Sequence, residues 1–441
     1  MLKLRERPPF TKEQAEKWIA DSKPTPFHVY EQEGIISAAH DFNSAFEWVS
    51  KHSEGFKNFF AVKALPNTYT LELLREEAGF GADCSSGPEL DLAEAAGILR
   101  NNAIYTSNDT PDNEFREAHE FGAIINLDDI KHIDAFERAV GCFPELICFR
   151  YNPGEKIKGN NIIGNPLEAK YGVPDHKIVE AYRRAIAKGA KRFGLHTMVC
   201  SNEREEESLI GTAKMMLGLA GRLHDELGID FEFINLGGGV GIPYRPEDKS
   251  VDVELFANSV RKAYEEMILD KGLKPPRIVM ECGRAITGLH GWLVARVLHV
   301  TDKYRSYVGL DASMSDLMRP ALYSEGQSAE GECYHHITVL GKEDPPKDSI
   351  YDVTGPLCEN NDKFARQRPL PKIEEGDLIA IHNTGAHGWA MGFNYNARLK
   401  HAEYLLHKDG SLEMIRRAQT RKDYFATLDF PGSKFAHLAG K

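Results

Sequence analysis

The 441-residue sequence has few of the features that mark membrane, secreted or metal-binding proteins. Its apolar runs are much shorter than the roughly 20 residues that a membrane helix requires. The first residues, MLKLRERPPF, lack the hydrophobic centre of a signal peptide. The seven cysteines are an odd number, and none is spaced as in a CxxC or Cys/His metal motif. We therefore expect a cytoplasmic protein with free thiols, no metal site and no membrane partner.

The sequence also lacks an excess of positive charge. It contains 54 Lys and Arg against 66 Asp and Glu, which gives a formal net charge of -12. Because nucleic acids and anionic membranes attract basic surfaces, this balance argues against either as the main partner. A local basic pocket for a small anion remains compatible with it.

Short apolar stretches alternate with helical stretches along the first two thirds of the chain. This order predicts a parallel sheet, and eight strand and helix units in sequence predict a (β/α)8 TIM barrel, an α/β fold. The eight expected strands are residues 59–63, 80–84, 103–107, 123–127, 146–152, 192–198, 231–236 and 277–283.

Beyond residue 286 the expected strands follow one another without helices between them, which predicts an antiparallel β domain. The early stretch PFHVYEQ precedes the barrel without a matching helix and could join that domain. We therefore expect an N-terminal segment (1–35) that joins the β domain, a barrel (36–286) that binds the cofactor proposed below, and a C-terminal β domain (287–441).

Lys63 stands out in the otherwise apolar stretch NFFAVKALPN. Taken alone, this stretch fits a lysine at a strand end whose ammonium group reaches solvent. Polar residues at the ends of other expected strands change that interpretation, because the chemistry of a barrel gathers at this edge. They are Asp83, Arg150, His196, Glu281 and Arg284. We therefore predict that Lys63 faces a shared apolar pocket, where burial would lower its pKa.

A glycine cluster, INLGGGVGIPY, follows the seventh expected strand. Gly237, Gly238 and Gly239 would let backbone N–H groups approach an anion, and barrels often bind phosphate at this position. The sequence has neither a Walker loop here nor a GxGxxG motif after the first strand, which disfavours a nucleotide. A phosphate site beside a lysine, a histidine and a glutamate predicts pyridoxal 5'-phosphate.

Nine motifs in order then resemble one known family. They are AVKALPN, ADCSSGPEL, FRYNPG, GLHTMVCSN, INLGGGVGIPY, ECGR, MRPALY, GPLCENND and NTGAHGWAMGFNYN. This series is similar to the diaminopimelate decarboxylases, pyridoxal phosphate enzymes of fold type III (alanine racemase-like), and it covers about residues 26 to 430. Such enzymes combine a (β/α)8 barrel with a C-terminal antiparallel β domain.

The resemblance implies roles for residues around the cofactor. Lys63 resembles the Schiff-base lysine, and His196 resembles the residue that stacks on the cofactor ring. Asp83, Glu89 and Arg150 resemble the polar network that supports this histidine.

Further cofactor contacts are implied at four places. Gly237 to Gly239 resemble the phosphate loop, and Glu281 resembles the partner of the pyridine nitrogen. Ser201 resembles the phosphate-binding serine, although the usual His-x-Gly-Ser is here stretched to His196-Thr-Met-Val-Cys-Ser201. His387 stands where the family usually has a tyrosine, and its ring nitrogen could donate to the phosphate.

The resemblance also implies substrate contacts. Arg284, Arg319 and Tyr323 resemble the residues that hold the far carboxylate of diaminopimelate. Cys358 and Glu359 resemble a pair that crosses a homodimer interface, where the cysteine is a candidate proton donor and the glutamate reads the distal amine.

The expected reaction is therefore decarboxylation of meso-2,6-diaminopimelate to L-lysine, the last step of lysine biosynthesis. Ornithine, lysine or a carrier-tethered substrate are alternatives, but two unpaired arginines would disfavour a substrate without a distal carboxylate. A non-catalytic pyridoxal phosphate-binding protein would be a single barrel, so the C-terminal domain argues against it. Racemase activity is compatible with the fold, but the GPLCEN motif resembles the decarboxylases.

Overall fold

The computed structural model describes residues 3–157, 165–325 and 329–428. These residues form two compact units. The first unit contains Ile36–Pro243 and Lys249–Ile286. The second contains Leu4–Ile35, Tyr244–Asp248 and the described residues from Thr287 onward. The segment Tyr244–Asp248, which the sequence placed in the barrel, thus packs with the second unit.

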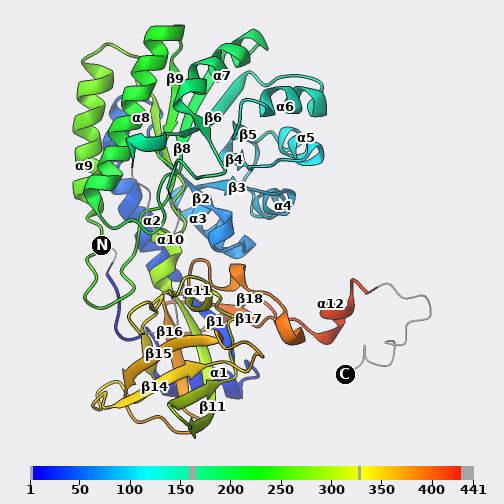
Figure 1. The fold of residues 1–441 in the computed structure, drawn as a ribbon, viewed down its shortest axis with the longest axis vertical. Helices are drawn as coiled ribbons and strands as arrows, with labels where there is room; N and C mark the ends of the chain where they lie inside the picture. The colour runs from blue at the N-terminus through cyan, green and yellow to red at the C-terminus, as the bar shows by residue number, and fades with distance from the viewer. Residues whose placement is uncertain (1–2, 158–164, 326–328, 429–441) are drawn as a thin grey trace. The chain divides into compact units, whose positions relative to one another are not determined.

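Eight parallel strands close into a barrel in the first unit (Figure 1). They are β2 (Phe56–Ala61), β3 (Gly81–Cys84), β4 (Ala103–Thr106), β5 (Ile124–Leu127), β6 (Leu146–Asn152), β8 (Arg192–Thr197), β9 (Phe231–Asn235) and β10 (Arg277–Met280). The pairings of β5 with β6 and of β2 with β10 complete the ring, and a short β7 (Val173–Pro174) pairs with β6 outside it. The predicted TIM barrel is confirmed.

Helices cover the outside of these strands (Figure 1). They are α2 (Gln32–Ala45), α3 (Thr68–Ala78), α4 (Gly87–Ala95), α5 (Asp112–Phe121), α6 (His132–Val140), α7 (Asp175–Ala187), α8 (Glu206–Leu227) and α9 (Val253–Tyr264). Local sequence sets several of their ends. The Asn67 side chain accepts from Tyr69 N to begin α3, and α3 ends at Gly79 in the left-handed conformation that glycine adopts without strain.

The second unit is built on a largely antiparallel sheet. Its strands are β1 (Phe27–Glu31), β11 (Gly291–Asp302), β12 (Ser306–Leu310), β13 (Ile337–Val339), β14 (Ser349–Thr354), β15 (Lys363–Leu370), β16 (Leu378–His382), β17 (Ala402–Leu406) and β18 (Leu412–Arg416). The early β1 pairs with β11 antiparallel and with β17 in parallel within this sheet. A second parallel pairing joins β12 and β14.

Strand β15 was not predicted, because its charged residues hide the pattern of a strand. Arg366 and Arg368 are nevertheless buried within it. Arg368 forms an ion pair with Glu332 at 2.6 Å, and Lys363 lies 3.4 Å from Asp352. Arg368 and Lys363 are thus paired with acidic residues distant in sequence, which a sequence pattern does not reveal.

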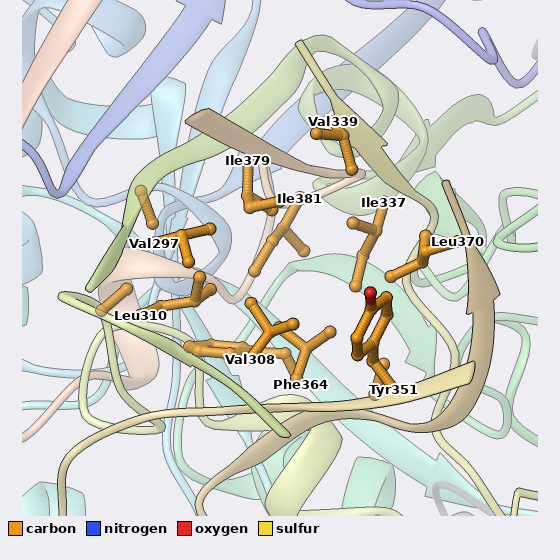
Figure 2. Close-up of a cluster of buried hydrophobic side chains, with 14 of the residues drawn as sticks. Val297, Val308, Leu310, Ile337, Val339, Tyr351, Phe364, Leu370, Ile379 and Ile381 are labelled. Atoms are coloured by element: carbon orange, nitrogen blue, oxygen red, sulfur yellow. The ribbon is translucent and has the colours of Figure 1, made fainter. Parts of the chain in front are cut away.

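One apolar core of the second unit fills the space between β11, β12, β13, β14, β15 and β16 (Figure 2). The side chains of Val308, Phe364, Ile379 and Ile381 meet there and are almost fully buried. Short helices, α1 (Lys12–Ala20), α11 (Arg319–Leu322) and α12 (Arg421–Phe425), also belong to this unit. Within the described ranges, no helix is both long and apolar enough to cross a bilayer.

Candidate active site

A cavity of about 630 Å³ lies at the carboxyl ends of the barrel strands. Its described lining comes from the first unit alone. Six residues predicted from the sequence line it, namely Lys63, Asp83, Arg150, His196, Ser201 and Glu281. Residues that are distant in sequence are therefore brought together as the barrel prediction requires.

Lys63 does not end a strand. Strand β2 stops at Ala61, and Lys63 lies in a following 3-10 turn, Val62–Ala64. Half of its side chain (51%) is exposed, and its Nζ is 3.6 Å from Asp83 Oδ2. Burial alone would lower the pKa of Lys63, but the charges of Asp83 and Glu281 outweigh burial and raise it. The predicted lowering of this pKa is wrong, because the pocket carries acidic groups as well as apolar ones.

Glu281 is held by hydrogen bonds on both oxygens. Asn235 Nδ2 donates to Oε1 at 2.7 Å, and His196 Nε2 lies 3.2 Å from Oε2. Although burial raises the pKa of Glu281, His196, Lys63 and Asn235 together hold it well below its usual range. The Glu281 carboxylate is therefore kept ionised inside the protein.

The ionised carboxylate also fixes the orientation of His196. Because Glu281 can only accept, His196 donates through Nε2–H, and its Nδ1 accepts from Asn126 Nδ2 at 2.8 Å. Asn126 also donates to Thr106 Oγ1 at 3.0 Å. Asn126 and Asn235 thus position the predicted residues, although sequence reasoning did not single them out. In the sequence, both asparagines stand among apolar residues, in AIINL and FEFINL, and a polar side chain in such a strand could have marked them as residues that face the site.

Asp83 lines the cavity, whereas Glu89 lies outside its described lining. Burial and the nearby charge of Glu281 raise the pKa of Asp83 well above its ordinary value. Glu89 lies in the first turn of α4, where its Oε2 accepts from Ser85 N at 2.7 Å. Neither has a described hydrogen bond to His196.

Arg150 lies inside β6 rather than at its end. Its Nη1 donates to Asp128 Oδ1 at 3.4 Å and to Asn108 Oδ1 at 3.2 Å. Its guanidinium carbon lies over the ring of Tyr171, 3.9 Å from the ring centre. The network expected to support His196 is therefore replaced by Asn126 and Glu281, while Arg150 shapes the neighbouring wall.

The glycine loop after β9 has space for glycine only. A Cβ on Gly237 would lie 2.2 Å from Thr197 O, and one on Gly239 would lie 2.4 Å from Cys200 O. Both glycines have positive φ, at 72° and 86°. Among the described residues the Gly239 N–H has no hydrogen-bond partner, so it is available to an anion.

Ser201 belongs to a loop that is paired with this glycine loop. Glu203 N donates to Gly239 O at 2.8 Å, and Gly241 N donates to Glu203 O at 2.7 Å. The inserted residues after His196 therefore return Ser201 to the cavity wall.

The remaining predicted residues lie outside this cavity lining. Arg284 is buried at the start of a short helix, α10 (Arg284–Thr287), in the first unit. The other five belong to the second unit, namely Arg319, Tyr323, Cys358, Glu359 and His387. Their roles stay predictions at this point.

The donor set fits pyridoxal phosphate. The cavity combines an amine, an ionised carboxylate and an imidazole, and a glycine loop follows the β9 strand beside it. These groups match an aldehyde, a ring nitrogen, a ring face and a phosphate, respectively. Within residues 3–157, 165–325 and 329–428, no group of three His, Cys, Asp or Glu residues could hold a metal ion.

Comparison with known proteins agrees with this chemistry. The family model for the pyridoxal binding domain of pyridoxal-dependent decarboxylases matches residues 34–288. Protein TabA of Pseudomonas amygdali pv. tabaci is 41% identical over 406 residues, which cover 92% of this chain and 91% of that protein. The diaminopimelate decarboxylase of Methanothermobacter thermautotrophicus is 33% identical over 418 residues, 94% of each chain. The crystal structure of the M. jannaschii diaminopimelate decarboxylase with L-lysine superposes with a TM-score of 0.85, 27% identity and 94% coverage of each chain.

Proposed function

Because this chain belongs to the family of pyridoxal-dependent decarboxylases, we propose that it converts meso-2,6-diaminopimelate to L-lysine and carbon dioxide. The relatives named diaminopimelate decarboxylase support this substrate. The family and the cavity support the reaction type, while the choice of substrate depends on how the far end of the molecule is recognised.

The observation that best supports this proposal is the buried charge of Arg319. Its side chain is only 3% exposed, yet no carboxylate forms an ion pair with it among the described residues. Its guanidinium lies over the rings of Tyr244 and Tyr323, at 4.9 and 5.4 Å from their centres. Because a buried cation is costly without an anion, the far carboxylate of diaminopimelate would be a stabilising partner.

The cavity residues would each contact a different part of the cofactor. Lys63 would hold its aldehyde end, the glycine loop and Ser201 its phosphate, and His196 its ring face. When bound, pyridoxal phosphate supplies an electron sink for the electron pair that departing carbon dioxide leaves behind.

Glu281 would place its negative charge beside the ring nitrogen and keep that nitrogen protonated. Its fixed position between Asn235 and His196 supports this role, because a preorganised charge need not rearrange during the reaction. Asp83, next to Lys63, would accept a hydrogen bond from the amine and limit its motion.

We propose that the active enzyme is a homodimer with shared active sites. Cys358 and Glu359 are exposed in the segment between β14 and β15, while the described cavity lining comes only from the first unit. A partner subunit could supply Cys358 as the proton donor to Cα and Glu359 as the reader of the distal amine. His387 remains a predicted contact of the phosphate.

Mixing two inactive variants tests the shared site. Lys63→Ala and Cys358→Ala dimers should each be inactive, and subunit exchange should restore up to about a quarter of wild-type activity by forming one intact site. A mixture that stays inactive although native mass spectrometry shows mixed dimers would contradict shared sites.

Decarboxylation of a related amino acid is the second candidate. The name of Protein TabA, at 41% identity, states no substrate, and the diaminopimelate decarboxylase of Methanothermobacter is 33% identical, so a related amino acid stays the alternative.

The decisive assay is product identification. Protein loaded with pyridoxal phosphate is incubated with meso-diaminopimelate, and released carbon dioxide and L-lysine are measured. Equal amounts of both products are expected, whereas the absence of both would refute the proposed substrate.

A further inference from the structure

Among the described residues, the groups in contact with the guanidinium of Arg319 are all neutral. Besides the two tyrosine rings, its Nη2 donates to the Sγ of Cys333 at 3.8 Å. Its buried Nε has no hydrogen-bond partner within the part of the chain that the structure describes. The positive charge is therefore oriented but not neutralised.

Cys333 is itself fixed to the helix that carries Arg319. Its backbone N donates to Ser324 Oγ at 2.9 Å, and the same hydroxyl donates to Pro320 O in α11. Arg366 Nη1 also donates to Ser324 Oγ, at 3.2 Å. Ser324 thus joins the cysteine, the arginine helix and strand β15 at one point.

Glu332, which precedes Cys333 in the sequence, forms its ion pair with Arg368. Glu332 Oε2 forms an ion pair with Arg368 at 2.6 Å, and its Oε1 accepts from Arg366 N at 2.9 Å. Both side chains of the pair are less than a tenth exposed. This pair anchors the segment to β15 and commits its negative charge to Arg368 rather than to Arg319.

The chemistry of a thiol suits this position. A cysteine sulfur is a weak neutral acceptor, so it can orient a guanidinium without cancelling its charge. A carboxylate at the same place would form an ion pair with Arg319 and remove its need for an anionic ligand.

We propose that Cys333 is a specificity-determining positioning residue, which aims the uncompensated charge of Arg319 at the far carboxylate of the substrate. This inference rests on the proposed function, because it assigns the residue that keeps Arg319 selective for a substrate with a second acidic end.

Three substitutions at one position test the inference through the split between KM and kcat. Cys333→Ala should raise the KM for diaminopimelate roughly fivefold, as expected for one lost hydrogen bond, with kcat nearly unchanged. Cys333→Ser keeps an acceptor and should restore most of the affinity. Cys333→Asp should raise KM much further, by roughly a hundredfold, because the new carboxylate competes for Arg319. Cys142→Ala, an exposed thiol in the other unit, is the matched control and should behave as wild type.

Calorimetric titration with pimelate separates this inference from the proposed reaction, because pimelate carries two carboxylates but no amine and cannot react. Binding should weaken in the order wild type, Cys333→Ala, Cys333→Asp. If wild type does not decarboxylate diaminopimelate but this order holds, the substrate proposal fails and the inference stands. Equal pimelate binding by wild type and by Cys333→Ala would overturn the inference, and this comparison decides the matter even if Cys333→Asp does not fold.

Discussion

Asn235 links Glu281 to the glycine loop. Its Nδ2 donates to Glu281 Oε1 at 2.7 Å, and its Oδ1 accepts from Gly237 N at 2.9 Å. One amide therefore sets both the carboxylate proposed for the ring nitrogen and the loop proposed for the phosphate. The two ends of the cofactor would be positioned by the same side chain.

Asn235→Ala should weaken both ends of the proposed cofactor site. Removing one hydrogen bond to a charged group and one to the loop is expected to lower the affinity for pyridoxal phosphate at least about tenfold. Titration of the apoprotein, followed by visible absorbance, measures this affinity. Asn43→Ala, which removes a hydrogen bond to Ala78 O away from the cavity, is the control. Equal losses in both variants would contradict the role of Asn235.

The raised pKa of Lys63 makes cofactor capture dependent on pH. Only the neutral amine attacks an aldehyde, so the rate of capture should rise with pH toward the pKa of Lys63. Asp83→Asn removes a charge that raises this pKa, so its profile should shift to lower pH and its rate at about pH 8 should exceed that of wild type.

Stopped-flow absorbance after mixing apoprotein with pyridoxal phosphate measures the two profiles. Asp109→Asn removes the same charge from an exposed residue of the cavity lining and should leave the profile unchanged. A shift to higher pH in Asp83→Asn would show that Asp83 does not raise the pKa of Lys63.

Gly239→Ala tests the close packing of the glycine loop. The added Cβ would meet Cys200 O at 2.4 Å, and φ is already 86°. Gly228→Ala has a similar positive φ of 67° but no atom within 4 Å of its Cβ, so it isolates the backbone strain.

We expect Gly228→Ala to cost about 1 kcal/mol of unfolding free energy, and Gly239→Ala to cost clearly more. Chemical denaturation of both variants without cofactor measures the difference. Similar values would mean that the loop can relax around a side chain.

Lys63→Ala tests covalent attachment. After treatment with borohydride, wild-type protein should gain the mass of one reduced cofactor per chain at Lys63, and the variant should gain none. Mass spectrometry of tryptic peptides identifies the modified residue. Modification of a different lysine in wild type would refute the assignment.

Much of the fold was predictable because the barrel strands are buried on both sides and appear as apolar runs. The residues at their ends, such as His196 and Glu281, followed from the same pattern and from the family resemblance. The hydrogen-bond partners of these residues could not be predicted, because Asn126 and Asn235 become recognisable only when strands distant in sequence lie side by side.

The partners of charged side chains were harder to predict. Strand β15 was missed because Arg366 and Arg368 interrupt its apolar pattern, and their polar contacts, among them those with Ser324 and Glu332, come from residues distant in sequence. The pKa of Lys63 was predicted in the wrong direction for a related reason, since the sequence does not show that two carboxylates approach its amine.

The most direct test compares a substrate that has a far carboxylate with two amino acids that lack one. The rate of carbon dioxide release, expressed as kcat/KM, is measured for meso-diaminopimelate, L-lysine and L-ornithine with the same enzyme preparation. Because Arg319 would be left without an anion by lysine or ornithine, diaminopimelate should be preferred by roughly a thousandfold or more. A kcat/KM for lysine or ornithine equal to or above that for diaminopimelate would contradict the proposed function.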